Sequence, residues 1–379
     1  MVGGSKVKVV SYNLPEKLDE FIKLPFNIYK NTEYKKYWVP PLISEVKKLF
    51  SKKNPFWKHS KIKIFLAEDN GKYIGRIAAI IDNVSNDFHS EKCGFFGYFE
   101  CINNEDVAKQ LITEAKKYLK SEGMDIIRGP MNPSTNDECA LLIEGFDSSP
   151  AIMMLYNPPY YAELIEKAGL KKAKDLYAWL RVAKDDPPPR IVKIVEHIKK
   201  KENIKFRHFD IKNFKRDVQY FKDIYNSAWE KNWGFVPMSD EEIDYMADGL
   251  KPLIDTRICH FLEVGGVPVG ATLALPDYNF VLKKLNGRMG PLEILKFLYW
   301  KRKIKFIRLM ALGVKKEYRG KGLEAVLYYE ILMACRKYGY SGGGELSWTL
   351  EDNDLINKGI SAMGGVVYKK YRIYEASLN

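Results

Sequence analysis

Two glycines flanked by two basic residues give one short segment of this chain the character of an anion site, Arg319-Gly-Lys-Gly322. The apolar run 309–314 before the segment predicts a buried strand, and the apolar spacing after it predicts a helix. Glycine backbone at a helix start leaves main-chain N–H groups unpaired beside the positive end of the helix dipole, and Arg319 and Lys321 add charge. This strand, loop and helix therefore predict a seat for a phosphate group.

Two other interpretations of the loop are open from the residues alone. The spacing Gly320-x-Gly322-x-x-Ala325 also fits the dinucleotide fingerprint of a Rossmann unit. Against it, about five polar residues separate Val314 from Gly320, and too little chain follows the next strand to complete such a fold. The plainest alternative is a glycine turn that starts a helix and binds nothing.

The loop resembles the acyl-CoA-binding motif of the GNAT acyltransferases, Arg/Gln-x-x-Gly-x-Gly/Ala. The chain departs from that motif at Glu324, a carboxylate where the family has a small residue. Glu324 would repel a pyrophosphate unless its side chain turns outward or Arg319 and Lys321 neutralise its charge. The resemblance covers the chain from about residue 204 onward well and the first half weakly.

A second motif follows the loop. The run Trp348-Thr-Leu-Glu-Asp-Asn353, with Gly364 eleven residues later, is similar to the GNAT pattern Asn-x-x-Ala-x-x-x-Tyr-x-x-x-Gly-Phe. Asn353 takes the Asn place, and Ile360 stands where the family often has a tyrosine. The usual acid that protonates the leaving thiol is therefore missing from this register.

The resemblance implies direct transfer of an acyl group, acetyl in the simplest case, from acyl-CoA to an amine. The thioester would lie between the strand ending at Val314 and the strand 345–350, and the amine would need a base and oxyanion-stabilising N–H groups. Glu345 and Glu351 are candidate bases by placement, and Tyr368 is a candidate acid. The implied contacts of the acyl-CoA co-substrate are Leu312, Gly313, Val314, Arg319, Gly320, Lys321, Gly322, Leu323, Glu324 and Asn353.

An internal duplication organises the elements that would position these residues. Segments 62–68 and 73–81 alternate like a hairpin around Asn70-Gly71, and segments 258–264 and 267–275 repeat the design around Gly265-Gly266, at an offset of about 195 residues. Each hairpin is followed by an apolar strand and a helix. We therefore expect an α/β fold (α+β, mixed sheet) of two tandem GNAT-like domains, each a mixed sheet flanked by helices.

The expected domains are residues 1–182, a linker at 183–203 that begins Ala183-Lys-Asp-Asp-Pro-Pro-Pro189, and residues 204–379. In the first domain, Asn103-Asn-Glu-Asp106 replaces the glycine loop, and its acids argue against phosphate binding, so this copy is expected to lack the cofactor seat. Polar residues of the loop 129–161 either serve a pocket or form turns packed on the sheet.

A basic insert at 277–307 has no counterpart in the first half. With Arg308 directly after it, the segment carries nine Lys and Arg residues against Asp277 and Glu293. The insert could bind an acyl carrier protein, RNA or the far phosphate of CoA. Alternatively, it is a solvated amphipathic helix on the sheet, with lysines that snorkel towards water. A homodimer is left open as well.

The composition limits the remaining classes. With 379 residues, 46% of them apolar, the chain can form two cores, and its net charge of +13 favours anionic partners. Five scattered cysteines and five isolated histidines indicate neither disulfides nor a metal site. With no signal-like start and no membrane span in the sequence, we expect a cytoplasmic, bacterial protein.

Three functional hypotheses follow. The chain is an N-acyltransferase acting on an amine or peptide, a non-catalytic sensor of acyl-CoA or lipid, or a transferase that depends on a carrier protein or tRNA. The paired loop and second motif favour the first, Glu324 and Ile360 favour the second, and the basic insert favours the third.

Overall fold

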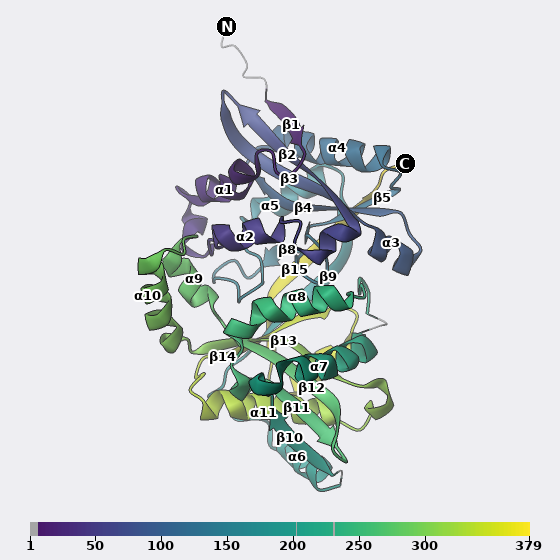
Figure 1. Cartoon of the computed structure of the whole chain (residues 1–379), viewed down its shortest axis with the longest axis vertical. Coiled ribbons are helices and arrows are strands. Elements are labelled where there is room, and N and C mark those ends of the chain that lie inside the picture. The colour runs from purple at the N-terminus through teal and green to yellow at the C-terminus, as the bar shows by residue number, and fades with distance from the viewer. Residues whose placement is uncertain (1–6, 202, 230–231) are drawn as a thin grey trace. The chain divides into compact units, whose positions relative to one another are not determined.

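The structure is a computed structural model that describes residues 7–201, 203–229 and 232–379. The chain divides into two compact units (Figure 1). Unit 1 contains the chain up to Asp175, Leu282–Leu298 and Lys370–Asn379, and unit 2 contains Leu176–Val281 and Tyr299–Lys369. Each unit therefore includes segments that are distant from one another in the sequence.

Unit 1 is built around a hairpin and the parallel strand pair that follows it. Its elements are β1 (Lys8–Tyr12), α1 (Leu18–Tyr29), α2 (Ile43–Leu49), β2 (Ser60–Asp69), β3 (Lys72–Asp82), α3 (Asn83–His89), β4 (Cys93–Cys101), α4 (Glu105–Ser121), β5 (Ile126–Gly129), β6 (Met131–Asn132), β7 (Glu138–Cys139), β8 (Leu141–Glu144), α5 (Tyr160–Lys167), and the short helices α9 (Asn279–Leu285) and α10 (Pro291–Trp300) for most of their length.

Unit 2 shares with unit 1 a core order of one strand, two helices, three strands, a helix and a strand. Its elements are α6 (Pro189–Lys201), β10 (Ile204–His208), α7 (Phe214–Trp229), α8 (Asp240–Leu250), β11 (His260–Val264), β12 (Val267–Pro276), β13 (Phe306–Val314), α11 (Leu323–Lys337), β14 (Gly343–Leu350) and α12 (Asp354–Ala362). Two further strands, β9 (Lys171–Arg181) and β15 (Val366–Ser377), pass from one unit to the other along the chain.

The two units have matching strand orders. Unit 1 runs β1-β2-β3-β4-β5-β15, and unit 2 runs β10-β11-β12-β13-β14-β9. The pairs β4–β5 and β13–β14 are parallel, whereas the other neighbours in these orders for which a register is described are antiparallel. The last strand in each order comes from the opposite half of the sequence. Strand β15, near the C-terminus, completes the order of unit 1, and strand β9, from the first half, completes that of unit 2.

The strand register supports the internal duplication at the level of single residues. In unit 1, Phe65 of β2 lies opposite Ser11 of β1, and in unit 2, Phe261 of β11 lies opposite Arg207 of β10. The expected mixed sheets and both predicted hairpins are confirmed.

Two features differ from the sequence-based division at 182 and 204. Residues 189–201, inside the expected linker, form α6, because a proline at the first helical position lacks only an N–H that would be unpaired there anyway. Helix α6 then packs against α11 through Val195 and Ile198 in one apolar core with Leu323. Most of the basic insert, Leu282–Leu298, belongs to unit 1.

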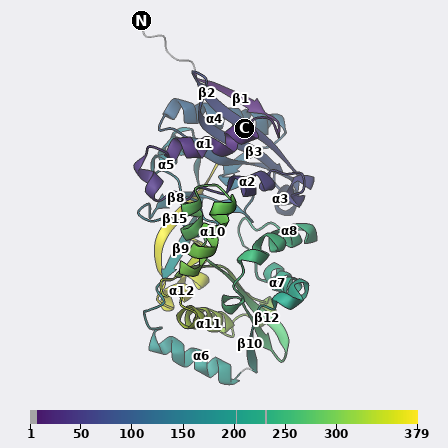
Figure 2. The same ribbon diagram turned by 60° about the vertical axis from the view of Figure 1, so that its left-hand side comes forward.

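Helices cover both faces of the sheet in unit 2, with α7 and α8 on one side of β12 and α11 on the other (Figure 2). Val314 packs with Leu323 and Leu327 of α11, whereas a Cβ on Gly313 would lie 2.5 Å from the Trp229 ring of α7. Alternate residues at the end of β13 therefore face opposite layers, as the two-residue period of a strand requires.

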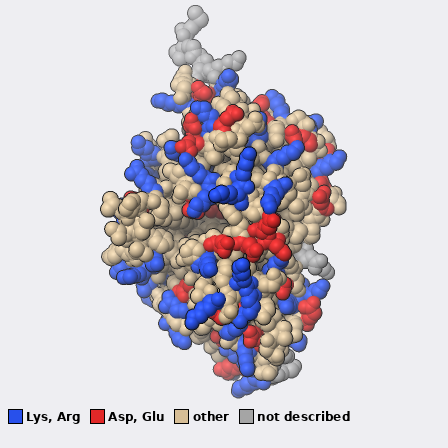
Figure 3. Space-filling model, viewed as in Figure 1, with Lys and Arg blue, Asp and Glu red and all other residues tan. Residues whose placement is uncertain are grey.

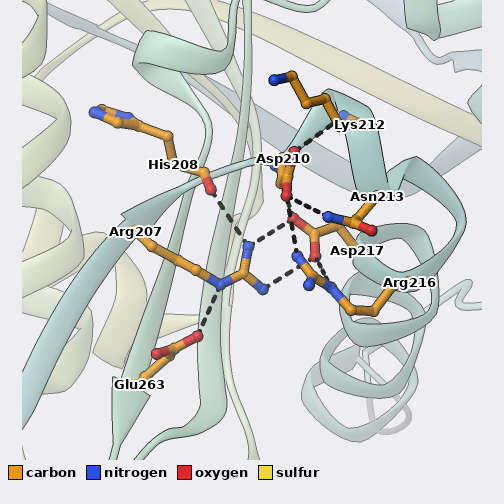
Figure 4. Close-up of polar contacts among 8 residues, drawn as sticks. All are labelled: Arg207, His208, Asp210, Lys212, Asn213, Arg216, Asp217 and Glu263. Carbon is orange, nitrogen blue, oxygen red and sulfur yellow. Dashed lines mark hydrogen bonds and ion pairs between the residues drawn. The ribbon is translucent and has the colours of Figure 1, made fainter.

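A buried ionic network fixes α7 to β10 (Figure 4). Asp217, which is fully buried, accepts hydrogen bonds from Arg207 at 2.6 and 3.1 Å, from Arg216 at 3.0 Å and from the Asp210 main chain at 2.8 Å. Arg207 also donates to Glu263 of β11 at 2.8 Å. The network holds one helical layer of unit 2 in place against its sheet.

Candidate active site

The parallel strands of unit 2 separate part of the way along their length. The strands β13 and β14 pair from Phe306 opposite Gly343 to Leu309 opposite Leu346. Beyond that point β13 continues to Val314 and β14 to Leu350, with no pairing between them. The main-chain edges of the two strand ends are therefore open to a ligand between them.

A β-bulge lies where the strands part. Ala274 of β12 pairs with Leu309 and Leu273 pairs with Ala311, so Met310 is an extra residue in β13. A bulge leaves the extra residue outside the regular ladder and turns the strand locally. Main-chain N–H groups at this position are suited to stabilising charge on a carbonyl oxygen.

The start of α11 is open, as the glycine loop predicts. Gly320 and Gly322 both have left-handed φ values, 76° and 74°, which favour glycine. Among the described residues, the N–H groups of Gly320, Gly322, Leu323 and Glu324 have no protein acceptor, and no side chain caps the helix. These donors and the helix dipole give the end of β13 the features that an anion-binding site requires.

The charged residues of the loop have separate positions. The Arg319 guanidinium donates to the carbonyls of Ser227 at 3.1 Å and Ala228 at 2.8 Å, so it ties the loop to the end of α7. The Lys321 ammonium lies 5.1 Å from the centre of the Tyr318 ring and is exposed. The Glu324 carboxylate makes no hydrogen bond to the loop and therefore does not occupy the open N–H groups.

Other residues predicted at the co-substrate have structural roles. Leu312, Val314 and Leu323 belong to the apolar core beneath α11, and Gly313 is covered by α7, so a ligand could meet their main chains but not the side chains of Val314 and Leu323. The Asn353 side chain accepts from the Ile356 N–H at 3.4 Å and caps α12.

A buried polar cluster lies at the point where β13 and β14 part. Glu345 is fully buried, and its two oxygens accept hydrogen bonds from the Ser347 and Tyr368 hydroxyls. Arg308 of β13 donates from Nε to Ser347 Oγ at 2.9 Å and lies 3.7 Å from Glu345 Oε1. The structure thus brings together the predicted base Glu345 and the predicted acid Tyr368 within unit 2.

The other candidate base is remote from this cluster along the chain. Glu351 lies in the turn after β14, where its carbonyl accepts from Asn357 at 3.3 Å. Five residues, 346–350, separate it from Glu345, which in an extended strand is a distance on the order of 20 Å. Sequence reasoning did not single out Arg308 or Ser347, although a charged residue inside an apolar strand is a usable signal for a buried partner.

A small apolar cavity of about 40 Å³ adjoins the last paired residues of the two strands. It lies within unit 2, beneath the C-terminal half of α11 and beside α12, and Arg181 and Gly343 line its other end. Its lining includes Leu309, Tyr328, Ile331, Leu332, Cys335, Leu346, Ile360 and Met363. Ile360, where the family often has tyrosine, therefore contributes to an apolar wall.

Burial keeps two ionisable groups of this wall, Cys335 and Tyr328, neutral. It raises the pKa of the Cys335 thiol to about 12, and burial with the nearby Glu324 charge raises the pKa of the Tyr328 hydroxyl. Burial likewise raises the pKa values of Cys93, Cys101 and Cys259 to about 12. None of these four thiols is suited to form the thiolate that a covalent cysteine intermediate needs.

The matching site of unit 1 is filled by the chain itself. The Asn104 side chain caps α4 by accepting from the Val107 N–H at 3.1 Å. At the bulge of β4, the Tyr98 N–H donates to Asn132 Oδ1 at 2.6 Å, and the Met131 carbonyl lies 1.7 Å from where a Cβ on Gly97 would be. These contacts occupy the positions where the first copy was predicted to lack a cofactor seat, and the loop after residue 129 packs on the sheet.

In the ranges 7–201, 203–229 and 232–379, no helix combines the length and apolar character needed to cross a membrane. No group of three His, Cys, Asp or Glu side chains in these ranges is arranged to bind a metal ion.

The fold is that of the tandem GNAT proteins. The tandem GNAT protein from the clavulanic acid biosynthesis pathway matches with a TM-score of 0.56 over 99% of both chains, at 11% sequence identity. At that identity the likeness concerns the fold alone. It confirms two GNAT-like domains over the whole chain.

No protein-family model matches this chain, but two bacterial proteins are similar to it in sequence over almost its whole length. Protein YghO of Escherichia coli K12 is 33% identical over 368 residues, covering 95% of this chain and 93% of its own. The bacterial ceramide synthase of Caulobacter vibrioides is 32% identical over 383 residues, covering 98% of each chain. The chain belongs to the family of these two proteins.

Proposed function

We propose that this protein is an N-acyltransferase that moves an acyl group from acyl-CoA to an amine by direct attack. The observation that carries the proposal is the coincidence, within unit 2, of an open helix start, two parting strands and a buried Glu345–Tyr368 pair. The open N–H groups of residues 322–324 would bind the pyrophosphate, and the thioester would lie near Met310.

The polar cluster supplies a path for the proton that the reaction must move. The amine lone pair forms the new C–N bond, the C–S bond breaks, and one proton passes from nitrogen to the leaving sulfur. Glu345 would accept the proton through the Tyr368 hydroxyl, and Tyr368 would then donate to the thiolate. Arg308 and Ser347 hold the carboxylate in position.

A finer proposal concerns the two substrates. The relative named bacterial ceramide synthase suggests that the acceptor is the amine of a long-chain base, and that the product is an amide of the ceramide type. For the donor we propose a long-chain acyl-CoA: the lining beside Leu309 and Leu346 is apolar, as an acyl chain requires, and the walls of this small cavity would have to separate to admit the chain. Burial of each additional CH₂ group would favour binding by about 0.8 kcal/mol.

The test measures turnover with matched pairs of donors and acceptors. Purified protein is incubated with acetyl-CoA or palmitoyl-CoA and with a long-chain base or a short amine, and amide is measured by mass spectrometry. We expect product from palmitoyl-CoA with the long-chain base. Glu345→Gln should lower kcat by about 100-fold or more, the range of general acid–base catalysis, whereas Glu351→Gln should change it little.

The outcomes separate the functional hypotheses. CoA binding without product from any pair would favour a sensor and contradict the proposed reaction. Product from a short amine alone would retain the transferase and remove the long-chain acceptor. Equal activity of Glu345→Gln and the unsubstituted protein would remove the proposed base.

A further inference from the structure

Helix α10 presents apolar side chains to solvent. Leu292 is 70% exposed, Ile294 48%, Leu295 65%, Leu298 44% and Tyr299 58%, and no residue of the helix is buried. These five residues lie on the outward side of the helix, since the less exposed positions Glu293, Phe297 and Trp300 share the opposite side. In most surface helices the apolar face packs against the core, whereas in α10 the apolar face is exposed to solvent.

The segment 283–287, which precedes α10, is held by contacts with other residues of unit 1. Gly287, at a φ of 78°, lies so close to the Phe26 ring that a Cβ would be 2.6 Å from it, and its carbonyl accepts from the Ile43 N–H at 3.1 Å. Lys283 donates to Ser149 Oγ at 3.0 Å. These contacts of Gly287 and Lys283 fix the position of the turn that leads into α10.

Basic residues surround the apolar surface of α10. Arg288 precedes the helix, Lys296 lies on it, and Lys301, Arg302 and Lys303 follow it in a short 3₁₀ turn, all exposed. In Figure 3 the surface over α10, at the left edge of the view, is uncharged. Within the helix the sole acid is Glu293, which is partly covered and accepts from the Gly290 N–H.

We propose that α10 docks the protein on an anionic phospholipid bilayer, with its leucines in the interfacial region and the neighbouring Lys and Arg side chains at the headgroups. Exposed leucines and an aromatic residue next to several cations are the pattern of an interfacial helix. The helix has 10 residues, too few to span a bilayer.

The charge of the surface selects this occupant over two others. A second copy of the chain would bring the same Lys301–Lys303 cluster against itself, a like-charge contact. An acidic carrier protein would satisfy the cations but would leave the broad row of leucines facing a polar partner. The inference rests on α10 and the basic residues that flank it, and it does not depend on the proposed reaction.

The test is co-sedimentation with vesicles of phosphatidylcholine containing 30% phosphatidylglycerol, compared with pure phosphatidylcholine. We expect binding to the anionic vesicles that weakens at high salt. The variant Leu292→Glu/Leu295→Glu should bind at least about 10-fold more weakly. Lys301→Glu/Arg302→Glu/Lys303→Glu should lose roughly 100-fold or more, at about fivefold for each basic residue.

Matched variants elsewhere on the surface control for hydrophobicity and net charge. Leu355→Glu changes a leucine of α12 that is 85% exposed, and Lys52→Glu/Lys53→Glu/Lys109→Glu makes the same change of charge at exposed sites. Both should bind vesicles within about twofold of the unsubstituted protein, apart from the long-range effect of charge. The α10 variants should retain the far-UV circular dichroism spectrum of the unsubstituted protein and its midpoint of unfolding in urea.

Two results would overturn the proposal. One is the absence of vesicle binding by the unsubstituted protein, or equal binding by the Leu292→Glu/Leu295→Glu variant. The other is a dimer, measured by light scattering, that the leucine variant converts to a monomer while vesicle binding is unchanged.

Discussion

Replacing Gly320 with aspartate should place a carboxylate at the open N–H groups before α11 and block binding of acyl-CoA. Gly320 suits the test because a Cβ there meets no heavy atom within 4 Å. Its φ of 76° is left-handed, which Asp and Asn tolerate better than other non-glycine residues. At Gly322, by contrast, a Cβ would lie 2.7 Å from Ile198 Cδ1, so a substitution would also disturb packing.

The magnitude follows from Coulomb repulsion. At 4 Å, two like unit charges repel by about 1 kcal/mol in bulk water and about 4 kcal/mol at an effective dielectric constant of 20. Gly320 is exposed, so the lower part of this range applies. Repulsion from two charges of a pyrophosphate then gives about 2–4 kcal/mol, which weakens binding roughly 30-fold to 1,000-fold.

Calorimetric titration with CoA measures this effect, and Gly320→Asn is the matched control because it has the same size and backbone preference without the charge. We expect Gly320→Asn to bind within about 10-fold of the unsubstituted protein and Gly320→Asp to bind far more weakly, with part of the loss removed by salt. Equal affinities of the Asp and Asn variants would refute the assignment of the phosphate seat.

Two further predictions concern the stability of unit 2. Asp217→Ala should lower the free energy of unfolding by about 3–5 kcal/mol in urea titrations, because it leaves the partly buried Arg207 without its main partner; an effect below about 1 kcal/mol would contradict this role of the network. His260 is 7% exposed, and its Nδ1 has no hydrogen-bond partner among the residues that the structure describes. Burial, with a smaller effect of His208, lowers its pKa to about 4. Because the folded state favours neutral His260, its contribution is present above the unfolded pKa of about 6.5 and is lost as the pH falls to about 4, by about 3 kcal/mol. His260→Gln should remove most of this acid sensitivity, whereas the exposed control His197→Gln should retain it.

The sequence predicted the elements that depend on local pattern. The strand before Gly320, the open helix start after Gly322 and the repeated hairpins follow from glycine positions and apolar spacing, which act within a few residues. The capped start of α4, with Asn104 in place of the glycine loop, was predictable for the same reason.

Features that depend on distant partners could not be predicted in the same way. The polar contact of Arg308 with Ser347 requires the parallel register of β13 and β14, and the sequence does not specify that register. The motif placed Asn353 at the co-substrate, but its side chain caps α12. The outward apolar face of α10 was also missed, because periodicity identifies a face without saying whether anything covers it.

The most direct measurement is a crystal structure of the protein with a non-transferable thioether analogue of a long-chain acyl-CoA. The account predicts the pyrophosphate on the N–H groups of Gly322, Leu323 and Glu324, the sulfur between β13 and β14 near Met310, and the acyl chain in the cavity beside Leu309. A pyrophosphate bound elsewhere, or a chain that leaves this cavity empty, would contradict it.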